Sequence, residues 1–367
     1  MFQNVLIVLV ILLGATSLYL GYERFFRRTR ETEPELYVRA LGDLLDGRTE
    51  SAFTKLRQVV AENTNNIDAY LRLGRILREH NKPERALQVH KDLTLRSGLE
   101  RDQKAAILTQ LVEDYLALND FETAEKALNE LISLDPRSRW AHRTQLSVRE
   151  KRQQWEAAYD TAVELLKLEG NKSKKPLARF KVHMASQLYR KREYHKARIV
   201  YKEAIGLDPT LVDAYLAIGD SYQLENRLED AVNFWRKLIS AVPQKGHLVI
   251  DRLKKTLFDL GRYGDMVEIC ENILEHDPKN LQARLTLAEF HEKKGDGDLA
   301  CEVLEGLVED YPEDLTVLIE IIRLYLDRGE RRKLQDLLQT LERNREKRNA
   351  ASTGMSPAAP DTTPVRT

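Results

Sequence analysis

The sequence predicts an all-α protein in which a stack of similar helical hairpins follows a single membrane-spanning helix. Three observations lead to this prediction. Small residues recur at a nearly constant interval along most of the chain. The composition, with 17 glycines, 11 prolines and 32% charged residues among 367, is typical of helical proteins. The stretch over residues 1–22 carries no charged side chain and is mainly apolar.

The uncharged N-terminal stretch is long enough to cross a lipid bilayer. From Phe2 to Tyr22, a helix would extend roughly 31 Å, which matches the thickness of a hydrocarbon core. Tyr19 and Tyr22 suit the interface between lipid and water. We therefore predict a transmembrane helix over residues 1–23, with residues 2–22 in contact with the bilayer.

A secretory signal peptide is the alternative interpretation of this stretch, but such a peptide begins with positive charges. Here the positive charges follow the apolar run, in a basic linker over residues 24–35 that contains Arg24, Arg27, Arg28 and Arg30. By the positive-inside rule, these arginines place the rest of the chain in the cytoplasm. They either touch anionic lipid headgroups or act only as an orientation signal.

A recurring order of large and small residues marks the repeating unit. One copy contains Tyr215, Ile218, Gly219, Tyr222, Ala231 and Pro243, and another contains Tyr70, Leu73, Gly74, Leu77 and Ala86. This order resembles that of the tetratricopeptide repeat, which is a hairpin of two helices. Glycine and alanine let two helices cross closely, and proline suits the turn into the next unit. The resemblance implies a right-handed superhelical solenoid.

The position equivalent to Ala231 can be followed along the chain at a nearly constant interval. It falls at Ala52, Ala86, Ala124, Ala158, Ala197, Ala231, Met266, Ala300 and Leu334. These positions predict about nine repeats over residues 36–345. The first and last units are degenerate, as expected for repeats that cap a stack.

Two of the intervals, from Ala86 to Ala124 and from Ala158 to Ala197, are longer than the others. Their extra residues fall in connections between units, and the first insertion lies near residues 97–103. The second lies near residues 170–176 and reads GNKSKKP, so the basic loop at 171–176 is either a docking site or a solvated loop. After the repeats, residues 346–367 are small, polar and rich in proline, which predicts a disordered tail.

The sequence contains no recognisable catalytic or metal-binding motif, so we expect a protein that is not an enzyme and carries no cofactor. Phosphate-binding, nucleophile-elbow and zinc-protease motifs are absent. The only cysteines, Cys270 and Cys301, are interpreted as small apolar residues in packed helices. The eight histidines are scattered, and we expect them on the surface or in a groove. Basic and acidic residues number 58 each, which argues against nucleic-acid binding.

Stacked hairpins form a concave groove that is lined mainly by the first helix of each pair and usually receives a peptide or helix of a partner protein. The register predicts these groove residues: Arg75, Arg78, Ser186, Tyr189, Arg190, Asp220 and Gln223. Each of them is either a contact for a partner or an ordinary solvated polar side chain.

The order of features along the chain resembles that of a bacterial family, lipopolysaccharide assembly protein B. In that family a membrane helix, a basic segment and about nine repeats follow one another, as over about residues 1–340 here. The nearest local resemblance includes Gly74, Arg75 and the segment ERALQVH at 84–90. The family ends in a rubredoxin-type metal domain with two CxxC pairs, whereas no cysteine follows Cys301 here. No metal site is therefore carried over, and the chain is either a divergent branch or a truncated relative.

This resemblance implies an adaptor at the bacterial inner membrane whose repeats face the cytoplasm. Members of the family regulate lipopolysaccharide synthesis by bringing the deacetylase that commits precursors to lipid A to a membrane-bound ATP-dependent protease. An adaptor needs no catalytic residue, because it acts by raising the local concentration of two partners. The alternative is a different membrane-tethered scaffold, for the assembly of another envelope or secretion complex.

Overall fold

The computed structural model describes residues 14–19, 22 and 32–353, with side chains described as far as Glu346. The residues described form helices joined by short connections and contain no strand. They divide into two compact units, Met1–Phe180 (unit 1) and Lys181–Thr367 (unit 2). The predicted all-α class is confirmed for this part of the chain.

Most of the predicted transmembrane helix lies outside the described residues, as do Arg24, Arg27, Arg28 and Arg30. Among the residues that are described, no helix is both long enough and apolar enough to cross a membrane.

The helix α2 (Glu33–Leu45) begins three residues before the predicted start of the repeats. It begins there because the amide of Thr32 donates a hydrogen bond to Glu35 (3.0 Å) and Pro34 suits the first turn of a helix.

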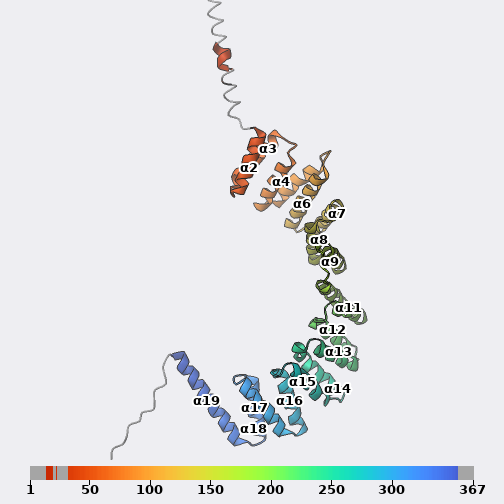
Figure 1. Ribbon diagram of the computed structural model, residues 1–367, viewed down its shortest axis with the longest axis vertical. Helices are drawn as coiled ribbons and strands as arrows, with labels where there is room; N and C mark the ends of the chain where they lie inside the picture. The colour runs from red at the N-terminus through yellow and green to blue at the C-terminus, as the bar shows by residue number, and fades with distance from the viewer. Residues whose placement is uncertain (1–13, 20–21, 23–31, 354–367) are drawn as a thin grey trace, which may run out of the picture. The chain divides into compact units, whose positions relative to one another are not determined.

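The described part of unit 1 contains four helical hairpins, each made of a first and a second helix that lie side by side (Figure 1). The first helices are α2, α4 (Ile67–Glu79), α6 (Arg101–Ala117) and α8 (Arg139–Lys151). The second helices are α3 (Thr49–Glu62), α5 (Pro83–Thr94), α7 (Phe121–Leu134) and α9 (Trp155–Glu169). A short 3₁₀ helix, η1 (Lys175–Leu177), leads into α10 (Ala178–Arg190), within which unit 1 ends.

The described part of unit 2 repeats the same arrangement. Its first helices are α10, α12 (Val212–Leu224), α14 (Ile250–Asp259), α16 (Leu281–Lys294) and α18 (Leu315–Asp327). Its second helices are α11 (Tyr194–Leu207), α13 (Leu228–Ala241), α15 (Asp265–His276), α17 (Gly297–Asp310) and α19 (Arg331–Thr353). The 3₁₀ helix η2 (Pro243–Val249) precedes α14.

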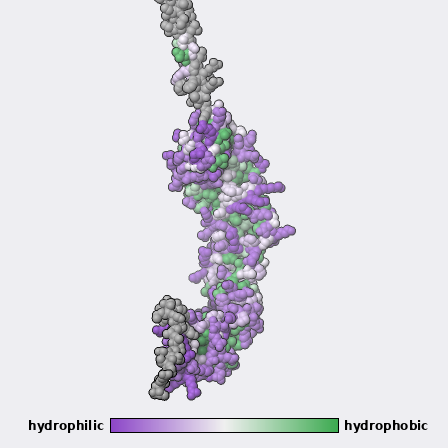
Figure 2. All heavy atoms as spheres, turned by 60° about the vertical axis from the view of Figure 1, so that its left-hand side comes forward, coloured by the Kyte–Doolittle hydropathy of each residue, from purple (hydrophilic) through white to green (hydrophobic). Residues whose placement is uncertain are grey.

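Hydrophilic side chains cover most of the face shown in Figure 2, with small hydrophobic areas between them.

Each turn between a first and a second helix contains one residue with a left-handed backbone conformation. Among the residues described, these are Gly47, Asn81, Asn119, Gln153, Arg192, Asn226, Gly261, Gly295 and Gly329, with φ from 56° to 92°. Each lies five residues before one of the nine positions that the sequence aligned, for example 226 before 231. The turn ends the first helix in the same way in every pair and therefore sets the register of the second helix.

The aligned small residues form the centres of the hairpins. The alanines at 52, 86, 124, 158, 197, 231 and 300 are fully buried, and Met266 is 1% exposed. Leu334, in the last pair, is only half-buried. Two of the first helices, α4 and α12, have a glycine at the crossing. A Cβ on Gly74 would lie 2.3 Å from Nε2 of His90, and a Cβ on Gly219 would lie 2.1 Å from Nε1 of Trp235. Both crossings therefore exclude any larger side chain.

The last helix, α19, continues to Thr353, past residue 346 where the disordered tail was predicted to begin. The sequence EKRNAAST over residues 346–353 contains no glycine or proline, so nothing in it ends the helix, and Gly354 is the first residue that would. The rest of the predicted tail, residues 354–367, lies outside the described residues.

Candidate partner-binding surface

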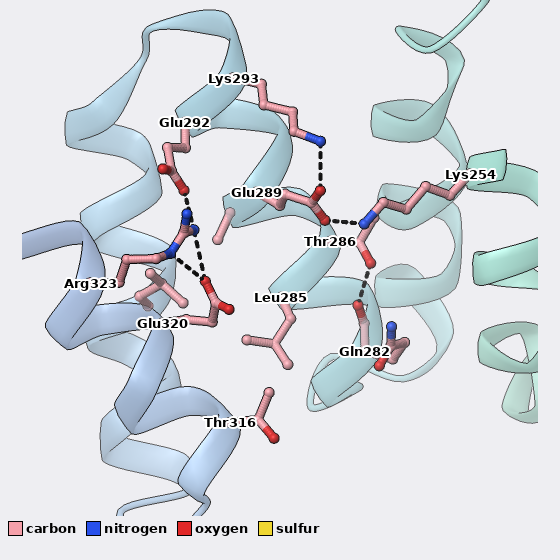
Figure 3. Close-up of a pocket in the computed structure, with 12 residues that line it drawn as sticks. Lys254, Gln282, Leu285, Thr286, Glu289, Glu292, Lys293, Thr316, Glu320 and Arg323 are labelled. Carbon is pink, nitrogen blue, oxygen red and sulfur yellow. Dashed lines mark hydrogen bonds and ion pairs between the residues drawn. The ribbon is translucent and has the colours of Figure 1, made fainter. Parts of the chain in front are cut away.

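Three consecutive first helices of unit 2 border an open pocket of about 530 Å³. Figure 3 shows that α16 runs through the centre of this pocket, between α14 and α18. Most side chains that line it come from these first helices, and Leu304 comes from α17. We call this surface the groove. It is lined by Lys254, Gln282, Leu285, Thr286, Ala288, Glu289, Glu292, Lys293, Leu304, Thr316, Glu320 and Arg323.

Ion pairs hold the charged side chains of the groove in place. On the α14 side, Lys254 and Lys293 both point toward Glu289, and the Lys293–Glu289 distance is 2.7 Å (Figure 3). On the α18 side, Arg323 lies between Glu292 (2.7 Å) and Glu320 (2.8 Å). Because cations and carboxylates adjoin one another in both groups, the groove presents paired charges of both signs rather than a field of one sign.

Two titratable groups show the electrostatic effect of these ion pairs. Burial raises the pKa of Glu289, but hydrogen bonds from Lys254 and Lys293 outweigh that effect and leave its pKa below the usual value. Burial lowers the pKa of Arg323, but the charges of Glu320 and Glu292 more than compensate, so its pKa is raised. Both groups therefore stay ionised at neutral pH.

The space between these ion pairs is less polar. Leu285, Ala288 and Leu304 line it, and the hydroxyl of Thr286 donates a hydrogen bond to the backbone oxygen of Gln282 (2.8 Å). Thr316 lies at one end of the pocket, at the start of α18 (Figure 3). An apolar floor with ordered charges at its edges is suited to bind a peptide or helix of another protein, since the floor takes apolar side chains and the charges fix their register.

Of the predicted groove residues in unit 1, Arg78 lies between helices and Arg75 is exposed. Arg78 is only 13% exposed and pairs with Asp114 (2.5 Å) and Glu113 on α6, while its guanidinium also donates to Gln110 (3.0 Å). Arg75 pairs within its own helix with Glu79 (2.8 Å). Arg78 thus joins the first helices of two successive hairpins.

Two predicted residues of unit 2 have the same role. Asp220 on α12 accepts two hydrogen bonds from Arg252 on α14 (2.8 and 3.3 Å). Gln223 donates to the hydroxyl of Thr256 on α14 (3.2 Å). These bonds place both residues on the side of the stack where first helices meet, but they also occupy the carboxylate of Asp220 and the amide nitrogen of Gln223.

The remaining three predicted residues lie on α10. The hydroxyl of Ser186 donates to the backbone of Val182 (2.8 Å) and contacts the hydroxyl of Tyr201 on α11 (3.0 Å), so it lies within its own hairpin. Tyr189 packs edge-to-face on Tyr194, and burial, helped by the charge of Asp220, raises its pKa. Arg190 is exposed. The structure therefore brings Tyr189 near Asp220, whereas Ser186 lies between two helices.

The expectation that all histidines lie on the surface or in a groove is wrong for two of them. His90 is fully buried beneath Gly74, and its ring nitrogens contact the carboxylate of Asp114 and the backbone oxygen of Leu71 (3.2 Å). His142 is 8% exposed and bonds the backbone oxygen of Pro136 (3.1 Å). The imidazole of His90 can be buried because both of its nitrogens find partners.

Sequence reasoning also missed the charged residues of the groove, although a signal for them exists. Partners on successive first helices are separated by about one repeat: 35 residues for Lys254 and Glu289, and 31 for Glu292 and Arg323. A search for opposite charges at this separation would have found these pairs.

The cysteines and the basic loop add no chemistry to this surface. Cys270 and Cys301 are both buried and unpaired, and burial raises the pKa of Cys270 to about 12. No cluster of three or more possible metal ligands occurs among the described residues. In the basic loop at 171–176, Lys172 and Lys174 are exposed.

Comparisons with known proteins agree with this arrangement. Tetratricopeptide repeat family models match residues 105–138, 213–245 and 257–319. Lipopolysaccharide assembly protein B of Escherichia coli (strain K12) is 22% identical over 305 residues, which cover 83% of this chain and 78% of that protein. The protein of the same name from Haemophilus influenzae is 24% identical over 274 residues, or 72% of this chain and 68% of that one.

Among solved structures, that of YrrB, a TPR protein, matches with 18% identity and a TM-score of 0.31, covering 51% of this chain and 92% of that one. This score is too low to support an inference about function. The family models and the two relatives agree on one conclusion: the chain is a tetratricopeptide repeat protein similar to lipopolysaccharide assembly protein B.

Proposed function

We propose that this chain is a scaffold that binds partner proteins through the first-helix face of its repeats and acts in lipopolysaccharide assembly. Its specific role in this proposal is that of an adaptor, which presents the deacetylase that commits precursors to lipid A to a membrane-bound ATP-dependent protease. The similarity to lipopolysaccharide assembly protein B over most of the chain supports the pathway. The groove in unit 2 supports the binding of a protein.

The groove is the observation that carries this proposal. Its volume of about 530 Å³ and its open form suit a segment of another protein, and its charges are already ordered by ion pairs. Side chains that are ordered before binding lose little conformational entropy when a partner arrives. The groove needs no catalytic group for this role.

Anchoring at the inner membrane, with the repeats in the cytoplasm, is part of the proposal. It is supported by the uncharged stretch over residues 2–22 and by the arginines that follow it. A reporter fused after Thr367 tests the orientation. Activity of a reporter that works only in the cytoplasm is expected, and activity of one that works only in the periplasm would contradict it.

The adaptor role is tested by blocking the groove in cells. Thr316 lines the groove and is exposed, so Thr316→Trp fills space there without touching the core. Thr340→Trp places the same side chain on the exposed part of α19 and is the matched control. In a strain that lacks the chain, the deacetylase should accumulate. Wild type and Thr340→Trp should restore its normal amount, whereas Thr316→Trp should not.

Different outcomes separate the two functions that remain open. If the amounts of deacetylase and of lipopolysaccharide do not change when the chain is deleted, the regulatory role is wrong. A membrane-tethered scaffold for another envelope or secretion complex would then be the better account. If deletion changes the deacetylase but Thr316→Trp behaves as wild type, the groove is not the surface that acts.

A further inference from the structure

Unit 1 contains a second pocket, of about 520 Å³, that none of the predicted groove residues lines. It lies between the end of α5 and α7, with α6 beneath, and we call it the outer cleft. Its lining residues are Thr94, Arg96, Leu99, Lys104, Ile107, Leu108, Leu111, Tyr115, Thr123, Lys126, Ala127 and Glu130.

The two sides of α6 show that the outer cleft is distinct from the first-helix face. Gln110 and Glu113 point to Arg78 on α4, on the side where first helices meet. Leu108, Leu111 and the neighbouring Tyr115 lie on the other side and line the cleft. The helical periodicity places such sets on different faces.

The floor of the outer cleft is apolar. Leu108, Leu111 and Tyr115 are between 5% and 9% exposed, and Ala127 on α7 is 9% exposed. Leu99 adds a half-buried apolar side chain from the connection between α5 and α6. The floor thus offers small, contiguous apolar areas at the bottom of a recess, which is where a partner's large apolar side chains would bind.

The rim of the outer cleft is mainly positive. Arg96, Lys104 and Lys126 line it, against one carboxylate, Glu130. Arg96 is held by the ring of Tyr70 (4.5 Å) and by the backbone oxygen of Thr64. Lys126 is exposed and pairs with Glu122 at the surface (2.9 Å), a contact that contributes little stability. Lys104 is exposed, so both lysines are accessible to a ligand.

The hairpin that carries extra residues in the sequence also borders this cleft. The aligned positions Ala86 and Ala124 lie further apart in the sequence than Ala231 and Met266, and α6 has 17 residues where α4 and α8 each have 13. Between α13 and α15 the corresponding pocket has a volume of only about 150 Å³. The larger recess thus lies at the hairpin with the insertion.

We propose that the outer cleft binds an acidic, amphipathic segment of a partner protein, separately from the groove in unit 2. Charge complementarity selects this occupant, because three cations and only one carboxylate surround an apolar floor. Acidic side chains meet Arg96, Lys104 and Lys126, while apolar side chains at helical spacing reach Leu108, Leu111 and Tyr115. A chain with two separate protein-binding sites can hold two partners at once.

The test uses the full chain and a fluorescein-labelled peptide with Leu and Phe at helical spacing and Asp and Glu elsewhere. A second peptide with Lys and Arg in place of the acids is the reference probe. Binding is measured by fluorescence anisotropy at several salt concentrations. The variant is Lys104→Glu/Lys126→Glu, and the control is Lys172→Glu/Lys174→Glu, which makes the same charge change in the basic loop of the same unit.

The acidic peptide should bind wild type more tightly than the basic one, and less tightly as salt rises. Reversing the cleft lysines should weaken binding about tenfold or more, and the control should change it by about twofold or less. Equal binding of both peptides, or equal loss in both variants, overturns the proposal. Two further results overturn the proposal if the wild-type chain does not bind the acidic peptide. In the first, the cleft variant loses binding to phosphatidylglycerol vesicles. In the second, the cleft variant loses self-association.

Discussion

The imidazole of His90 on α5 and the carboxylate of Asp114 on α6 are hydrogen-bonded to each other, and both side chains are fully excluded from solvent. Arg78 on α4 bonds the other oxygen of the same carboxylate (2.5 Å). Asp114 thus joins three helices of two successive hairpins. We expect this carboxylate to matter more for stability than any exposed ion pair of the chain.

Replacing Asp114 by alanine should destabilise unit 1 by about 3 kcal/mol or more, because Arg78 and His90 would lose a buried partner. The free energy of unfolding from urea denaturation of the full chain measures this effect. Glu113→Ala is the control, since Glu113 also pairs with Arg78 but is 37% exposed, and its loss should cost about 1 kcal/mol or less. Equal losses in the two variants would contradict the assignment.

Two glycines of unit 2 should respond to the same substitution in opposite directions. Gly219→Ala would place a Cβ 2.1 Å from the indole of Trp235 and should destabilise by about 1–3 kcal/mol. Gly206→Ala, on α11, meets nothing within 4 Å and should stabilise by up to about 1 kcal/mol through better helix propensity. Urea denaturation measures both changes. A neutral Gly219→Ala would mean that α12 and α13 do not cross as described.

The sequence alone predicted the spacing of the hairpins and the centres of most of them. Small residues at a nearly constant interval are visible without a structure, because a close crossing tolerates only small side chains. The turns that share this interval were less visible. Gly47 fits a left-handed turn, but Gln153 and Arg192 adopt it too, and neither residue type signals such a turn.

The side chains that join successive hairpins were harder to predict. Arg78 and Asp220 were expected to be open to a partner, yet both are bonded to the next first helix. A helical register shows which face of its helix a residue lies on. It does not show whether a side chain of opposite charge on the next first helix lies within bonding distance. The groove around Glu289 was missed for the same reason, since its lysines come from different helices, α14 and α16.

The first hairpin should lose stability in acid. Hydrogen bonds from Lys55, Ser51 and Arg48 hold the pKa of Asp43 well below its usual value. A carboxylate whose folded pKa is lowered stabilises the fold above its unfolded pKa of about 3.9, and this contribution is lost as the pH falls toward the folded value. Amide hydrogen exchange in α2 and α3 should therefore speed up below about pH 4 relative to the rest of unit 1.

Asp43→Asn removes this charge and tests the assignment. The variant should exchange faster than wild type at pH 7 and depend less on pH between neutral and acid. Asp46→Asn, which removes an exposed carboxylate from the same turn, is the control and should behave as wild type. An unchanged acid response in Asp43→Asn would show that another group controls the hairpin.

The thiol of Cys270 should resist alkylation in the folded chain. Burial raises its pKa to about 12, so at pH 8 almost none of it is the reactive thiolate, and its side chain is 1% exposed. Iodoacetamide followed by mass spectrometry should label Cys270 only after denaturation. Rapid labelling under native conditions would mean that α15 is not packed as described.

Photo-cross-linking in membranes decides whether the groove of unit 2 holds a partner protein. A photoreactive amino acid replaces Thr316 in the groove or, as the control, Thr340 on the exposed part of α19. We expect one strongly cross-linked protein segment from position 316, identified by mass spectrometry, and little or no product from position 340. No cross-link from position 316, or the same products from both positions, would contradict it.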